Sequence, residues 1–134
     1  MTIQAIVDWT QAAILVAAPS LKSAPSYPSD KKISVPSSQI FVTNVKFDSE
    51  GGFALNFFDM RIEITIPRKS LDDAMKFLVP LLEPIGKIFT DSPNLGGTCQ
   101  TSGQVTANLA QDNVADIPTI GYVFIVPDIK MKGS

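Results

Sequence analysis

The sequence contains no histidine and only one cysteine, Cys99, among its 134 residues. Without histidine there can be no Ser-His-Asp triad, no Cys-His nucleophile pair and no histidine-based metal site. One cysteine cannot form a disulfide within the chain, and no base or cation stands next to Cys99 to activate its thiol. We therefore expect no metal, no cofactor and no enzymatic activity.

Neither acidic nor basic residues are in large excess in the sequence. The 11 basic and 13 acidic residues give a formal charge of −2, with a pI near 4.9. This balance argues against sequence-specific binding of nucleic acid. The apolar run at 12–18 is too short for a membrane helix, and no Lys or Arg precedes it as in a secretory signal. We expect no membrane partner and a reducing compartment of synthesis.

The length predicts a single domain over 1–134, large enough for a hydrophobic core. No internal repeat is present. A stretch at 19–38 is rich in serine and holds four prolines, which predicts a long loop. It is either a surface connection or an arm that becomes ordered on a partner. Tyr27, between Pro25 and Pro28, is the candidate contact residue within it.

Residues 3–17 predict an amphipathic helix, because apolar side chains recur there at the spacing of one helical face. Thr2 is placed to cap its first turn, and Pro19 predicts its end. We interpret Trp9, beside the apolar stripe, as a packing residue of the core or its edge.

Residues 39–48 are β-branched and aromatic without a breaker, which predicts a strand. Alternation puts Phe41, Val45 and Phe47 on one face, and Ile40 and Val42 on the other. Both faces would then be partly apolar. Residues 49–52, which include Gly51 and Gly52, predict a turn.

The strand predicted at 53–66 alternates most clearly in its second half. Met60, Ile62, Ile64 and Ile66 alternate with Asp59, Arg61, Glu63 and Thr65, so one face is expected to be buried and the other wet. Alternating charges on a wet strand face favour cross-strand pairs or a protein interface over catalysis. The candidate subunit-interface residues are therefore Arg61, Glu63 and Asp59, together with Tyr27 from the loop.

A second helix is expected to begin after Ser70, with Ser70 as its N-cap and Asp73 as the reciprocal acceptor. The pair Asp72 and Asp73 suits a helix start better than an acid–base pair. Pro80 predicts a bend. Since Pro84 and Gly86 also weaken the helix, residues 90–103 are expected to form a loop.

The C-terminal third predicts a strand at 104–110, a turn or connection at 111–118 and a strand at 119–132. Pro127 predicts an edge position or a bulge in the last strand. The expected fold class is α+β: a small, mostly antiparallel sheet with two helices packed on one face, in the order α-β-β-α-β-β.

In this order the chain resembles the tail terminator proteins of long-tailed, siphovirus-type bacteriophages. The features that carry the resemblance are an amphipathic N-terminal helix, the Pro-rich stretch after it, a strand at 40–42, the alternating strand 60–67, the capped helix from Ser70 and the ending 121–125.

The resemblance implies a non-enzymatic structural protein of the virion, made in the host cytoplasm. Tail terminators form rings, typically hexamers, that cap the tail tube and provide the head-attachment surface. The implied partners are further copies of the chain, the tail tube protein and a head-completion or connector protein. The family has no catalytic motif, so no functional residue is transferred.

The residue pattern of the predicted strands itself favours binding to a partner molecule. Two of them carry apolar residues on both parities, and helices on one side cannot cover both faces of a sheet. Two alternatives stay open. One is another phage head–tail connector or minor tail protein. The other is a small-molecule or peptide-binding module that uses the second apolar sheet face.

Overall fold

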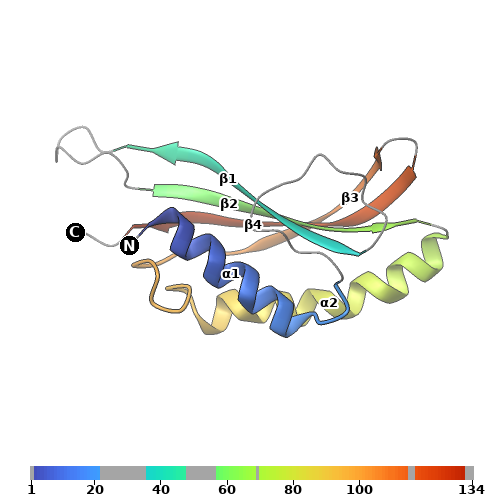
Figure 1. The fold of residues 1–134 in the computed structure, drawn as a ribbon, viewed down its shortest axis with the longest axis horizontal. Coiled ribbons are helices and arrows are strands. Elements are labelled where there is room, and N and C mark those ends of the chain that lie inside the picture. Colours follow the sequence, from blue (N-terminus) through green and yellow to red (C-terminus); the bar gives the residue numbers. More distant parts are fainter. Residues whose placement is uncertain (1, 22–35, 48–56, 69, 115–116, 132–134) are drawn as a thin grey trace.

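The structure, a computed structural model, describes residues 2–21, 36–47, 57–68, 70–114 and 117–131. Its elements follow the predicted order α-β-β-α-β-β: α1 (Ile3–Ala17), β1 (Ser37–Lys46), β2 (Phe57–Pro67), α2 (Leu71–Asp91), β3 (Thr106–Val114) and β4 (Ile117–Lys130). The four strands form one antiparallel sheet in the order β1-β2-β4-β3. Both helices lie on one side of this sheet (Figure 1), which confirms the α+β prediction. Tyr27, with most of the 19–38 stretch, and the 49–52 turn lie outside the described residues.

The helix starts follow the predicted capping chemistry. Thr2 Oγ1 accepts a hydrogen bond from the backbone N–H of Ala5 (3.2 Å), and Ser70 Oγ accepts one from Asp73 (3.2 Å). Asp72 forms an ion pair with Lys76 one turn later (3.0 Å). These contacts agree with the interpretation of the aspartates as a helix start.

The second helix continues further than the sequence predicted. It runs without interruption through Pro80, Pro84 and Gly86 as far as Asp91. Ile85 and Phe89 are buried in the core on either side of Gly86. Packing of this face outweighs the weak intrinsic helix propensity, so the loop prediction was wrong at 90–91. No helix in the described part of the chain combines the length and hydropathy of a membrane span.

The core lies between the helices and the sheet. Along β2 every second side chain is buried, from Phe58 to Ile66, in the alternation that the sequence predicted. Ile6 and Ile14 of α1 contribute to the same cluster of buried residues. Trp9 is partly buried against this cluster, and a Cβ added at Gly96 would overlap its indole ring. Trp9 is therefore a packing residue, as expected.

The last two strands differ from their predicted bounds. The first extends four residues beyond the predicted 104–110, and the second begins at Ile117, so the predicted turn at 111–118 is mostly strand. The ladder between them runs unbroken from Thr106 opposite Ile125 to Val114 opposite Ile117. Backbone pairing therefore continues through a polar segment that lacks the alternation of a half-buried strand.

Two β-bulges interrupt the sheet, one on each side of the same part of β2. One lies in β4 at Pro127 and Asp128, because Phe58 and Met60 pair with Ile129 and Val126. The predicted bulge at Pro127 is confirmed. The alternative of an edge position is wrong, because β4 is central in the sheet.

The other bulge lies in β1 between Thr43 and Lys46, where Asn44 has a positive φ of 51°. An extra residue reverses the alternation beyond it. Lys46 now pairs with Phe57 on the side of the sheet away from the helices. The strict alternation that the sequence predicted therefore ends at this bulge, and Phe47, which is 65% exposed, lies beyond the last residue of the strand.

Candidate functional site

The side of the sheet opposite the helices is the candidate interaction surface, which we call the open sheet face. No described helix or strand lies over it (Figure 1). The strand registers place two cross-strand rows at its centre. These rows are Phe41, Arg61, Ile125 and Thr106, and beside them Gln39, Glu63, Val123 and Asn108.

Arg61 is held in place by two neighbours on the open sheet face. Its Nε lies 2.8 Å from Oε2 of Glu63, and its guanidinium carbon lies 4.5 Å from the centre of the Phe41 ring. The side chains of Arg61 and Glu63 remain 40% and 32% exposed. An exposed ion pair of this kind contributes little to stability, at most about 1 kcal/mol. Its consequence is a charged group that is already ordered at a surface a partner can reach.

Asp59 is different, because both of its carboxylate oxygens are used within the chain. Oδ2 accepts a hydrogen bond from Asn44 Nδ2 (2.9 Å), and Oδ1 accepts one from the backbone N–H of Asp128 (2.9 Å). Asn44 and Asp128 are the positive-φ residues of the two bulges, at 51° and 52°. The carboxylate therefore ties the two bulges together across β2. Of the predicted interface residues, Asp59 has a structural role that the sequence did not indicate.

We expect Asp59→Ala to lower the free energy of unfolding by about 2 kcal/mol, since it removes two charge-assisted hydrogen bonds at a partly exposed site. Asn44→Ala removes only one of them, but alanine is also strained at the positive φ of this position, so it should cost about 2 kcal/mol as well. Urea unfolding of both single variants and of the double variant measures the coupling between the two side chains. Strictly additive effects would contradict the direct contact.

The large apolar side chains that are most exposed do not lie at the centre of the open sheet face. Among the described residues they are Leu15, Val16, Val45, Phe47, Leu71, Val79 and Leu109. Phe41, Val123 and Ile125 are partly buried beside the charged row. The open sheet face is thus mixed in character, rather than the apolar second face that the strand patterns predicted.

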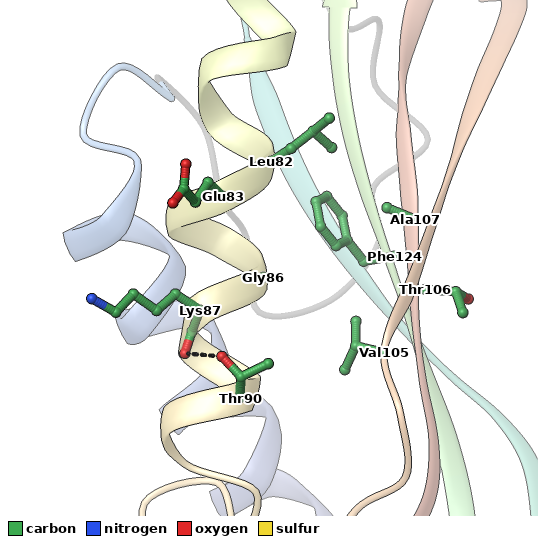
Figure 2. A pocket seen from close by; sticks show the side chains of 9 residues that line it. All are labelled: Leu82, Glu83, Gly86, Lys87, Thr90, Val105, Thr106, Ala107 and Phe124. Atoms are coloured by element: carbon green, nitrogen blue, oxygen red, sulfur yellow. Dashed lines mark hydrogen bonds between the residues drawn. The ribbon is translucent and has the colours of Figure 1, made fainter.

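A groove lies at the opposite side of the sheet, between α2 and β3, and we call it the α2/β3 groove. It has a volume of about 470 Å³. Figure 2 shows Leu82 of α2 pointing toward Phe124 of β4 across the groove, with Val105 and Ala107 on the strand side. Gly86 borders it without a side chain, and a Cβ built there would meet no atom within 4 Å. Glycine at position 86 therefore leaves this part of the groove wall without a side chain.

Other sequence features have local structural roles. Gly96 and Gly97 both have positive φ, at 67° and 83°, in a turn that is followed by no helix. Cys99 is fully buried. Within the described ranges no three Cys, Asp or Glu side chains gather in a way that could hold a metal ion.

Comparison of the whole chain with models of known protein families and with curated proteins gives no match.

Proposed function

We propose that this protein is a ring-forming tail terminator, which caps the tail tube of a bacteriophage and provides the surface to which the head attaches. The resemblance in element order supports this, and the open sheet face is the observation that carries it. Its charged row is ordered in advance by contacts within the chain, so a partner would bind it at little cost in side-chain entropy.

Capping follows from surface complementarity. A ring of identical subunits presents two different faces, and each subunit meets its neighbours through two different patches. One face of the ring would match the end of the tail tube, whereas the other would not accept a further tube subunit. The head-completion or connector protein would bind that second face. No bond is made or broken, which agrees with a sequence that offers no catalytic motif.

Arg61→Glu is expected to leave the fold intact and to weaken assembly. The variant replaces an attractive Arg61–Glu63 pair by two like charges on a surface, which should cost the fold about 1 kcal/mol or less. At an interface, a reversed charge opposes the partner and costs more. Light scattering after size exclusion, with the protein alone and mixed with tail-tube ends, measures the assembled mass.

Lys76→Glu is the matched control, since it makes the same charge reversal on α2, far from the open sheet face, at a residue that is 73% exposed. It should assemble like the wild type. Equal assembly of the Arg61→Glu variant and the wild type would remove the open sheet face from the proposed contacts.

A small-molecule or peptide-binding module is the second candidate, and the α2/β3 groove is what favours it. Its volume lies within the roughly 300–1,000 Å³ of ligand pockets. Such a module would remain a monomer or dimer of 14.4 kDa subunits under the same measurement. Another head–tail connector or minor tail protein would assemble, but would not arrest the growth of tail tubes.

A further inference from the structure

The outer edge of β3 presents backbone groups that no described strand pairs with. β3 is the last strand in the sheet order β1-β2-β4-β3. It is nine residues long, contains no lysine, arginine or proline, and pairs with β4 without a register shift. Sheet edges are commonly kept from pairing with other chains by lysine, proline or a bulge. Because β3 has none of these features, its edge remains able to pair with a further strand.

The residues of β3 that face this edge follow from the ladders. Neighbouring residues of an antiparallel strand direct their N–H and C=O groups to opposite sides. The N–H of Arg68 donates to the carbonyl oxygen of Pro118 (2.9 Å), so Pro118 faces β2 and the next residue, Thr119, faces β3. Thr119 pairs with Asp112. Alternation from this pair directs outward the backbone groups of Ala107, Leu109 and Gln111.

The two edges of the sheet differ in access. All three outward-facing residues of β3 are exposed, and the exposed fraction of Leu109 is 46%. The same alternation gives β1 the outward-facing residues Ser38, Ile40 and Val42, of which Ser38 and Ile40 are only 2% and 3% exposed. β1 is also interrupted by the bulge at Asn44. β3 is therefore the edge that another strand can reach.

A strand added at this edge would have one row of side chains beside the α2/β3 groove. Ala107 pairs with Phe124, which is buried on the helix side, and residues directly opposite each other share a face. Figure 2 shows Ala107 directed toward the groove and Thr106 away from it. In an added strand, the residues opposite Ala107 and Leu109 would also lie on the helix side, near Leu82 of the groove wall. Apolar side chains suit these positions.

We propose that the edge of β3 accepts an extended segment of a partner protein as a further strand of the sheet, with alternate apolar side chains of that segment in the α2/β3 groove. The backbone groups of β3 supply affinity for any extended chain, and the groove favours a segment with an apolar residue at every second position. This acceptor edge does not depend on the proposed ring, since a single subunit contains all of it.

A second copy of the chain fits this edge less well than a segment of another protein. Two β3 strands could pair antiparallel, but centring the pair on Leu109 or on Ala110 puts a polar side chain of the second copy opposite Ala107. That side chain would lie beside the apolar groove, where it loses contact with water. Centring the pair on Asn108 avoids this cost, but only residues 106–110 of each strand would then pair.

The test compares peptides that differ in which backbone edge they offer. The probe is a fluorescein-labelled peptide as long as β3, with alternating valine and threonine and a lysine at each end. Its valines should face the groove, so the valine N–H groups should bind β3. N-methylation of two valines removes two of these donors and should weaken binding at least about 10-fold. N-methylation of two threonines should leave the affinity within about threefold. Fluorescence anisotropy with the full chain measures all three affinities.

Amide hydrogen exchange, followed by NMR, locates the bound peptide. Exchange at Ala107, Leu109 and Gln111 should slow when the peptide binds, because their N–H groups gain acceptors. Exchange at Asn108 and Ala110 should change less, since their N–H groups already face β4.

Leu109→Pro tests the same contact from the side of the protein. It removes one outward N–H at an edge position where proline is tolerated, so the variant should fold and bind the peptide at least about 10-fold more weakly. Leu109→Thr is the matched control, because it also removes the leucine side chain but keeps the N–H. It should bind the peptide within about threefold of the wild type. Thermal melting of both variants checks the fold.

Three results would overturn the proposal. They are failure of the peptide to saturate the protein at about 1 mM, equal affinities of the two methylated peptides, and slow, concentration-dependent exchange at the β3 edge without peptide, which would assign the edge to a second copy. A ring that assembles but binds no peptide would overturn the acceptor edge and leave the proposed function intact. A wild type that binds the peptide but never assembles would do the reverse.

Discussion

Gly121→Val is expected to prevent the protein from folding. Gly121 lies in β4, opposite Thr65 of β2 and Ala110 of β3, at the centre of the sheet. A Cβ at this position would overlap the carbonyl oxygen of Ile64. That oxygen belongs to the backbone of the neighbouring strand, so no side-chain rotation can relieve the overlap. The two strands would have to separate where the β2–β4 ladder joins the halves of the sheet.

The expected loss is more than about 4 kcal/mol, a large part of the stability of a domain this size. Circular dichroism with urea titration measures it. Ala110→Val is the control, because it adds side-chain volume on the adjacent edge strand at an exposed position. It should change stability by no more than about 0.5 kcal/mol. A Gly121→Val variant with wild-type unfolding would contradict the close approach of β2 and β4.

Ile64→Asp is expected to abolish cooperative folding as well, for a different reason. Ile64 is 2% exposed in the core between the sheet and the helices. Aspartate at this site would leave a carboxylate without a partner in an apolar environment and remove the packing of the isoleucine. The combined cost should exceed about 4 kcal/mol.

Arg61→Glu is the matched comparison, because it places a carboxylate on the same strand at the opposite parity. That variant should fold, and the Ile64→Asp variant should not, as judged by near-ultraviolet circular dichroism and heat capacity on melting. A reversal of these outcomes would show that the assignment of the two faces of β2 is wrong. The placement of Arg61 on the open sheet face would then be wrong as well.

Much of the fold could be predicted from local patterns. The alternation from Asp59 to Ile66 fixes which face of β2 is buried, since a slip of one residue would expose the whole apolar set. Thr2 and Ser70 mark the helix starts because their hydroxyls satisfy backbone donors of the first turn. The structure confirms these three predictions.

The remaining features depend on contacts that are distant in the sequence. The bulge at Asn44 becomes evident only when β1 is paired with β2, and it places Lys46 opposite Phe57 on the open sheet face. Asp59 connects two bulges through partners 15 and 69 residues away. Asparagine tolerates positive φ, so Asn44 within a strand pattern was the available signal for a bulge.

The α2/β3 groove had a signal of a similar kind. Its low helix propensity makes Gly86 a weak point of the second helix, although a glycine inside a helical pattern can also have a packing or functional reason. The sequence could not distinguish these two interpretations of Gly86, because the space around it depends on which strand faces α2. The structure shows a continuous helix with open space at Gly86.

The proposed function requires that copies of this chain assemble into a closed ring. The most direct test is the mass of the purified wild-type protein by light scattering across a range of concentrations, alone and with tail-tube ends added. The proposed function predicts a discrete species, near six times the 14.4 kDa of one chain if the ring is a hexamer. A single species of 14.4 kDa under every condition, with tube growth unaffected, would contradict it.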